Sequence, residues 1–171
     1  MATLAVEQHE LSLRPGLDFP TLTYAYCRWK GEGVFKDIFY QDPDALLVDF
    51  LGWNMAGAVE ALGLYDGDTL WGMGWVNQKY EVDGVRMAEV GVGFFKGVPL
   101  SIWRRALDLM LTHAFIEVGL EVVYGLCPTQ NRAAMEFIRK CRMTKVDKLP
   151  WGQEVGPEVG VYELRKDRWL Q

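Results

Sequence analysis

In the middle of the chain the spacing of apolar residues changes repeatedly, and each change predicts a new element. From Met87 to Phe95 successive residues alternate between two faces, which is typical of a strand. From Ser101 to Val118 apolar residues recur every three or four positions, as on one face of a helix, and Gly119 is placed to end it. A short β-branched and aromatic run at 121–126 predicts a buried strand, and residues 131–141 predict a second helix.

The order strand, helix, strand predicts a βαβ crossover whose two strands run parallel. Two further strands are expected before it, at 59–65 and 69–80, joined by an Asp-Gly-Asp turn at 66–68. A final hairpin is expected from 144–149 and 160–165. Together these patterns predict an α+β fold in one domain spanning the chain: a mixed, mostly antiparallel sheet of six or seven strands with helices on both faces.

The first third of the chain has weaker patterns. Residues 1–9 are expected to form a loose end, and alternation from Leu11 onward predicts a short first strand. A helix is expected from Thr21 to Trp29. Another is expected from Pro43 to Trp53, because Asp42 can cap it and proline suits the first helical position.

Composition narrows the classes of partner. The 171 residues carry 18 basic and 23 acidic side chains, so the chain lacks the basic footprint of a nucleic-acid-binding protein. No apolar run approaches the roughly 20 residues of a membrane span, and no targeting segment is apparent, so we expect a cytoplasmic protein without a membrane partner. Seven tryptophans favour either an aromatic cleft or an apolar interface such as that of a homodimer.

Cysteine and histidine do not indicate a metal site. Cys27, Cys127 and Cys141 are odd in number and lack short spacings, so neither a disulfide framework nor a zinc site is expected. We interpret them as reduced core thiols. His9 and His113 are the only histidines, and neither has a carboxylate at ligand spacing.

Glu89 is the best candidate for a general base. It shares one face of its strand with Gly91 and Gly93, and a carboxylate in partly apolar surroundings can have a raised pKa and accept a proton. A glycine within a strand often marks a place where a ligand comes close. The alternatives are a Glu89 paired with a surface cation, and glycines that allow a bulge or tight packing beneath Trp71 or Trp75.

The segment that opens the last long helix, Asn131-Arg132-Ala133-Ala134, is followed by Phe137 and Lys140. With the preceding strand, helix and strand, it resembles the core of the GNAT superfamily of N-acetyltransferases over roughly residues 60–165. The resemblance implies acetyl-CoA as co-substrate, bound between the two parallel strands, and direct transfer to the amine of a small molecule or peptide. Glu89 would then take the amine proton.

The same resemblance implies roles for neighbouring residues. Asn131 would hydrogen-bond the pantetheine arm, although asparagine is equally a preferred helix N-cap without any ligand. The strand after Glu89 would hold the pantetheine and the thioester through Val90, Gly91, Val92 and Gly93. Acidic residues before the second strand would suit an amine acceptor or simply form a solvated helix surface; they are Asp37, Asp42, Asp44, Asp49 and Glu60.

Two positions depart from the family pattern. The family's glycine-containing diphosphate loop corresponds to Pro99–Arg104, which contains no glycine, and its bulky side chains would obstruct a diphosphate. Arg104 and Arg105, with Lys96, could supply positive charge instead. Ile138 stands where the family often has a tyrosine that protonates the leaving thiolate, so either Tyr124 serves as the acid or Tyr124 is a hydrogen-bonded core residue.

These observations support an acetyl-CoA-dependent N-acyltransferase. They leave open a catalytically inactive GNAT-fold protein used for binding or assembly, as in phage-encoded head-assembly proteins that this chain resembles. A third hypothesis is an acyltransferase whose pantetheine donor lacks the usual phosphate contacts.

Overall fold

The computed structural model describes residues 10–171, so the prediction for residues 1–9 lies outside it. Seven strands form one sheet in the order β1-β2-β3-β4-β5-β7-β6, in which only β4 and β5 are parallel neighbours. The strands are β1 Leu11–Pro15, β2 Val59–Asp66, β3 Thr69–Val82, β4 Val85–Phe94, β5 Val122–Pro128, β6 Thr144–Val146 and β7 Val159–Arg165. The expected α+β architecture and its parallel pair are confirmed.

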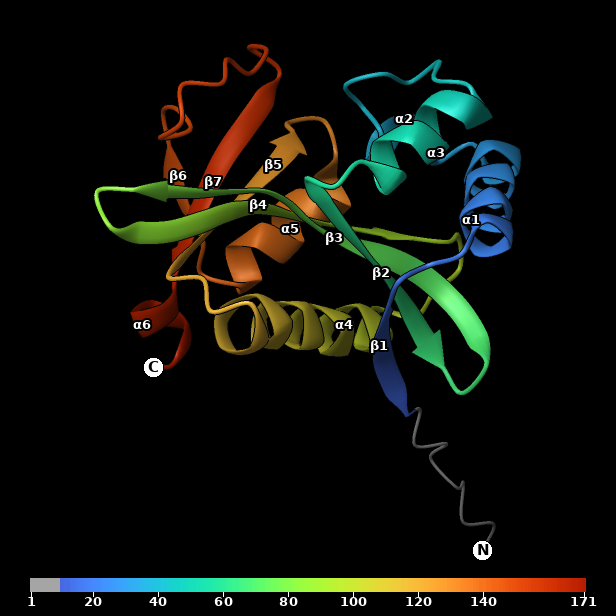
Figure 1. Cartoon of the computed structure of the whole chain (residues 1–171), viewed down its shortest axis with the longest axis horizontal. Helices are drawn as coiled ribbons and strands as arrows, with labels where there is room; N and C mark the ends of the chain where they lie inside the picture. The colour runs from blue at the N-terminus through green and yellow to red at the C-terminus, as the bar shows by residue number, and fades with distance from the viewer. Residues whose placement is uncertain (1–9) are drawn as a thin grey trace, which may run out of the picture.

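Helices cover both faces of this sheet (Figure 1). α1, α2 and α3 pack on one face, and α4 and α5 lie on the other. The helices are α1 Phe19–Glu32, α2 Phe35–Ile38, α3 Leu47–Met55, α4 Leu100–Thr112 with its continuation η1 His113–Glu117, α5 Arg132–Lys140 and α6 Lys166–Trp169. Across residues 10–171, no helix is both long enough and apolar enough to cross a bilayer.

β4 lies between the two helical layers, and its two faces contact different helices. Ala88 and Phe94 point toward α4 and belong to the cores beneath it. Met87 on the opposite face packs beside β5, and Gly93 on that face lies against Ile38 of α2. This alternation confirms the two faces expected from the sequence.

The parallel pairing of β4 with β5 is short. It joins Met87–Glu89 to Val122–Tyr124, after which β5 continues to Pro128 with β7 as its partner. From Val90 onward β4 is paired with β3 alone. The two strands therefore separate immediately after Glu89, and one edge of the β4 backbone faces the gap.

The two helices predicted in the first third of the chain, which correspond to α1 and α3, differ from their expected ranges. α1 extends beyond Thr21–Trp29 because the Asp18 carboxylate accepts a 2.9 Å hydrogen bond from the Thr21 amide and caps an earlier start. The prediction that α3 begins at Pro43 is wrong: the helix begins at Leu47. There the Asp49 side chain accepts a 3.0 Å hydrogen bond from the Leu46 amide.

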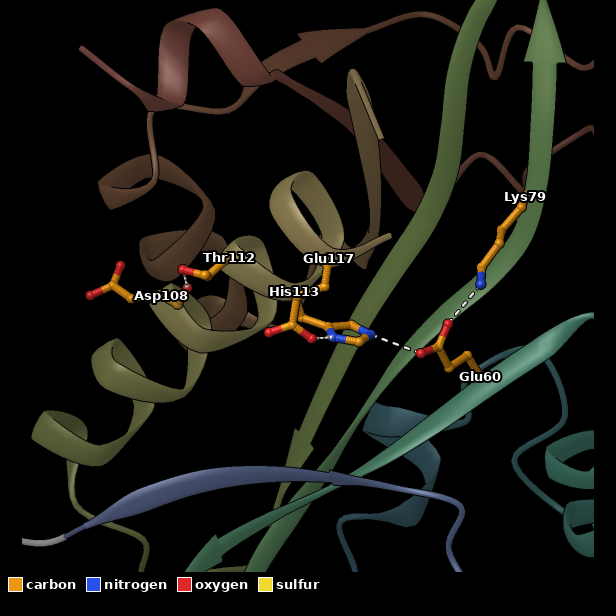
Figure 2. A network of polar contacts seen from close by, with 6 residues as sticks. All are labelled: Glu60, Lys79, Asp108, Thr112, His113 and Glu117. Carbon is orange, nitrogen blue, oxygen red and sulfur yellow. Dashed lines mark hydrogen bonds and ion pairs between the residues drawn. The ribbon is translucent and has the colours of Figure 1, made fainter. Parts of the chain in front are cut away.

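The predicted long helix from Ser101 to Val118 changes type near its end. α4 gives way to the π-helix η1 before Gly119, which adopts a φ of 78° and ends it as expected. At this junction the ring of His113 lies between two carboxylates: Nε2 is 2.8 Å from Glu60 and Nδ1 is 2.6 Å from Glu117 (Figure 2).

The contact with Glu60 ties the end of α4 to the sheet. The Lys79 ammonium also donates to Glu60, at 2.7 Å, so β2, β3 and η1 meet at one carboxylate (Figure 2). Burial alone would raise the pKa of Glu60, but the hydrogen bonds from Lys79 and His113 outweigh it and lower this pKa.

The C-terminal segment is less regular than expected. β6 ends at Val146, so the strand predicted to Leu149 is shorter, and α6 follows β7 without a sequence prediction. The loop between β6 and β7 places Trp151 in a stack on Tyr80, with ring centroids 4.6 Å apart. The expectation of three core thiols is wrong for Cys27, which is exposed, whereas Cys127 is buried.

Candidate active site

A cavity of about 430 Å³ opens where β4 and β5 separate. Residues from the segment after α2, from β3, β4 and β5, and from α5 line it, and its walls include Trp53, Trp75 and Phe137. The charged and polar residues of its lining include Asp37, Tyr40, Gln41, Asn77, Glu89, Lys96 and Asn131. The site is therefore an apolar cleft with a few convergent polar groups, as is usual for a small-molecule site.

Glu89 is the titratable group best suited to chemistry in this cavity. Burial raises its pKa to about 7, and a hydrogen bond from the Asn77 side chain, directly across the β3–β4 ladder, acts in the opposite direction. Near neutral pH this carboxyl can therefore both accept and release a proton, which is the property that a general base requires.

The two glycines beside Glu89 differ in what surrounds them. A Cβ on Gly91 would meet only the Trp75 ring, at an ordinary 3.6 Å. A Cβ on Gly93 would lie 2.8 Å from Ile38 and 3.2 Å from Trp29. Tight packing therefore requires glycine at position 93, whereas position 91 has room on the cavity side.

Val90 and Val92 line the cavity while their side chains pack against the core beneath α4. What they can offer to a ligand is consequently their backbone, on the edge that β5 leaves after Glu89. This edge resembles the exposed side of a strand, which can pair with an extended ligand.

Asn131 lines the cavity and also caps α5. Its side-chain oxygen accepts a 3.1 Å hydrogen bond from the Ala134 amide, so the predicted cap is confirmed. The amide nitrogen of the same side chain is left as a donor for the cavity.

Tyr124 pairs with Glu89 in the strand register, yet its side chain lies outside both major cavities. Its hydroxyl donates a 2.7 Å hydrogen bond to Glu163, and its ring lies edge-on to Trp151. The structure thus favours the core-tyrosine interpretation of this residue over a role as acid.

Trp103 occupies the first turn of α4, where the sequence predicts a diphosphate loop. Its ring stacks on Phe94 with centroids 4.6 Å apart and lies edge-on to Phe137. A second cavity of about 910 Å³ lies on its far side, and Trp103 lines both. The indole therefore forms part of the wall between the two spaces.

The backbone of the loop before α4 is partly occupied by the protein itself. The Lys96 amide donates a 2.6 Å hydrogen bond to the Glu32 carboxylate at the end of α1. A carboxylate therefore binds the backbone three residues before Pro99–Arg104, the segment that corresponds to the family's diphosphate loop.

Basic side chains gather around the second cavity instead. Arg104, Lys140, Arg142 and Arg168 line it, together with Trp169, and they outnumber its two acidic residues, Asp108 and Glu136. Arg105, a predicted cofactor-binding residue, is exposed and lies outside both cavities. The helix turns Arg105 away from its neighbour, because adjacent helical residues point in different directions.

No protein-family model matches the sequence, and no curated protein matches it significantly. Solved structures are similar over almost the whole chain. Spermidine N-acetyltransferase from Vibrio cholerae, in complex with CoA and spermine, superposes with a TM-score of 0.75 at 14% identity, covering 94% of this chain and 98% of that one. A probable GNAT-family acetyltransferase from Chromobacterium violaceum gives 0.67 at 19% identity, covering 94% and 90%.

This chain has the GNAT fold. RimL, a ribosomal L7/L12 alpha-N-protein acetyltransferase in complex with CoA, adds a TM-score of 0.69 at 13% identity, covering 92% of this chain and 95% of that one. The element order on which the predicted resemblance depended is therefore confirmed at the level of the fold.

Within this GNAT fold, sequence reasoning missed two polar residues of the cavity. Asn77 lies opposite Glu89 but belongs to a strand whose register with β4 was unknown. Tyr40 follows α2, in a segment without a clear periodic pattern, and reaches the cavity only through the packing of α2. In residues 10–171, no cluster of His, Cys, Asp or Glu could hold a metal ion.

Proposed function

We propose that this chain is an acetyl-CoA-dependent N-acetyltransferase that acts on an amine by direct transfer. The observation that carries the proposal is the partly buried Glu89 carboxyl, with a pKa of about 7, lining a cavity at the point where the two parallel strands separate. The CoA complexes among the structural neighbours support the same donor.

The cavity has the parts that such a reaction needs. The pantetheine arm would lie along the free edge of β4 from Val90 to Val92, whose backbone groups would orient the thioester carbonyl. The amine nitrogen attacks the carbonyl carbon and its proton passes to Glu89, directly or through water. The C–N bond forms, the C–S bond breaks, and the thiol departs.

The second cavity would take the nucleotide end of the donor. Arg104, Lys140, Arg142 and Arg168 supply positive charge there, and Trp169 offers an aromatic face. Trp103, Ala133 and Phe137 line both cavities, so the two spaces adjoin, and one extended ligand would pass beside these three residues.

The other end of the first cavity suits a cationic amine. Asp37 and Glu89 supply more negative charge than the single lysine of the lining, Lys96, offsets, and Trp53 and Trp75 provide aromatic walls that attract cations. The net charge of −5 on the whole chain also favours a cationic acceptor. A small molecule or a peptide with a free amine is the proposed acceptor class; spermidine, named for the Vibrio enzyme, is a suitable first probe.

The test begins with calorimetric titration of acetyl-CoA and desulfo-CoA into the purified protein. Turnover is then followed with spermidine, a peptide with a free N-terminus and an amino sugar. The wild-type protein should bind the donor saturably and acetylate at least one amine. Glu89→Gln should bind the donor equally well and lose about 10²- to 10⁴-fold in kcat.

The pH dependence gives an independent readout. Only the carboxylate form of Glu89 can accept a proton, so kcat/KM of the wild-type enzyme should rise as pH passes 7. The Glu89→Gln variant should lack this rise. An unchanged profile in the variant would remove Glu89 from the reaction.

A binding or assembly role is the competing function. The Trp103 ring in the first turn of α4 favours it, because this ring lies in the segment that corresponds to the diphosphate loop. The Glu32 carboxylate on the Lys96 amide also favours it, because it places a negative charge close to that segment. Absence of CoA binding at millimolar concentration would reject the transferase proposal and support this role.

A further inference from the structure

Three tyrosines lie on β5 or near its residues, and their hydroxyls differ in what they contact. Tyr124 donates to Glu163 at 2.7 Å, and Tyr162 donates to the Met135 sulfur at 3.2 Å. Both side chains lie outside the Glu89 cavity. Tyr40 lines that cavity, and its hydroxyl oxygen is buried without a hydrogen bond of ordinary geometry to any group in residues 10–171.

The Tyr40 hydroxyl lies near reactive groups of both separating strands. Tyr40, Glu89 on β4 and Cys127 on β5 all line the same cavity, and Glu89 and Cys127 each repel a negative charge on the Tyr40 oxygen when they are ionised. Burial is the main cause that raises the pKa of Tyr40 well above its usual value, and Glu89 and Cys127 raise this pKa further. The Gln41 side chain lowers it, but by less. At neutral pH the side chain is therefore a protonated phenol with an O–H available to donate.

The proposed reaction needs such a donor. An alkyl thiolate is a moderate base, and it departs faster when a proton is supplied. Position 138 on α5 is an isoleucine, buried against Cys127 and Tyr162, so it cannot supply one. Tyr40 approaches the gap between the strands from the opposite helical layer, on the segment that follows α2.

We propose that Tyr40 is the acid that protonates the departing CoA thiolate, an inference that rests on the proposed function. As the amine nitrogen bonds to the carbonyl carbon, the C–S bonding pair moves to sulfur, and the Tyr40 proton follows it. Glu89 holds the proton from the amine. Transfer of that proton from Glu89 to the Tyr40 phenolate restores both groups for the next cycle.

The first test is Tyr40→Phe, assayed with acetyl-CoA and the amine that the wild-type protein acetylates fastest among spermidine, the free-N-terminal peptide and the amino sugar. The kcat should fall about 10²-fold or more, because general acid catalysis commonly contributes that much. The KM for acetyl-CoA should change little. Tyr162→Phe is the matched control: it removes a hydroxyl from the other side of Cys127, outside the cavity, and should leave kcat unchanged.

The second test separates acid catalysis from a packing role. Tyr40→3,5-difluorotyrosine keeps the shape of the side chain but makes the phenol much more acidic. An acid at position 40 then predicts a new decline in kcat at alkaline pH that the wild-type enzyme lacks. A tyrosine that only packs would give the same alkaline profile in both proteins. Thermal melting of each variant shows that the fold is retained.

The outcomes distinguish the two proposals. If the wild-type protein acetylates none of the three amines, the proposed function fails and the Tyr40 assignment with it. If the wild-type protein is active but Tyr40→Phe retains its kcat, or Tyr124→Phe loses kcat instead, only the Tyr40 assignment is overturned. Loss in Tyr40→Phe together with a shifted alkaline profile supports it.

Discussion

Glu89 connects the stability of the protein to its proposed chemistry. Its pKa is about 7 in the folded chain, compared with about 4.5 for an ordinary glutamate. Between these two pH values the folded state binds a proton that the unfolded state has released. The stability associated with this group is therefore fully present below the unfolded pKa and is lost as pH rises through the folded pKa.

Replacing this carboxyl by an amide should stabilise the protein at alkaline pH. Above pH 8 the free energy of unfolding of Glu89→Gln should exceed that of the wild-type protein by up to roughly 3 kcal/mol, since one pKa unit corresponds to about 1.4 kcal/mol. Urea denaturation at several pH values measures the difference, which should shrink toward pH 4.5. Glu154→Gln, at an exposed position, serves as control. A difference that does not vary with pH would contradict the assignment.

The two glycines of β4 make a matched pair. Gly93→Ala should destabilise the protein by about 1–3 kcal/mol because the new Cβ overlaps Ile38 and approaches Trp29. Gly91→Ala adds the same atom at an ordinary distance from Trp75 and should cost much less. Urea unfolding of both variants tests this, and equal losses would show that Ile38 moves aside freely.

At this scale the sequence predicted Glu89 and its glycine neighbours, because alternation along one strand is a local property. It did not predict Tyr40 or Asn77, whose positions depend on contacts with distant parts of the chain. Tyr124 was ambiguous for a related reason: the strand register places it beside Glu89, but the rotamer and Glu163 decide where its hydroxyl points.

Among the elements, α5 combines a cap with a cavity wall through Asn131. Asn131→Ala should cost about 1 kcal/mol of stability by removing the acceptor for the Ala134 amide, whereas Asn131→Asp keeps that acceptor. Calorimetry with CoA then separates the roles. If the side-chain amide nitrogen contacts the pantetheine, both variants lose affinity. Unchanged affinity in Asn131→Asp would leave Asn131 as a cap alone.

The junction between α4 and η1 depends on His113. His113→Ala should destabilise the protein by about 1–3 kcal/mol, because the partly buried Glu60 would keep only Lys79 as a charged partner. Glu117, whose side chain is 65% exposed, should matter less: Glu117→Gln should cost under about 1 kcal/mol. Urea denaturation compares them, and equal effects would mean that Glu60 is satisfied by Lys79 and water.

The sequence predicted the boundary of an element correctly where a single local feature, such as a turn sequence or a glycine, determines that boundary. The hairpin turn at 66–68 and the end of the continuous helix α4–η1 before Gly119 were predicted because few backbone conformations fit them. The start of α3 was mispredicted because several acidic residues compete to cap it. Asp49 forms the cap once the preceding residues have taken their place beside α1.

At the scale of the whole molecule, the site depends on how two helical layers meet a split sheet (Figure 1). The layer of α1 to α3 brings Tyr40 and Trp53 to one side of the gap, and α4 and α5 bring Trp103 and Asn131 to the other. Trp103 then stands between the two cavities that one CoA molecule would occupy.

This arrangement predicts that Trp103 limits CoA affinity. Trp103→Ala should bind CoA about tenfold more tightly, equivalent to about 1.4 kcal/mol, while affinity for pantetheine, which lacks the nucleotide, should not increase. Trp103→Phe, which preserves an aromatic stack on Phe94, is the control. Calorimetry measures both ligands, and melting curves confirm folding. Equal losses of affinity for CoA and for pantetheine would contradict the prediction and would show that the indole contributes to binding both ligands.

The sequence by itself determined the order of elements, the parallel crossover and the face of β4 that carries Glu89, because periodicity and turn chemistry act over a few residues. Tertiary structure alone decided where β4 and β5 separate, that Trp103 lines both cavities, and that Tyr40 lines the same cavity as Glu89. These features arise from side-chain packing between residues far apart in the chain, and no local pattern encodes such contacts.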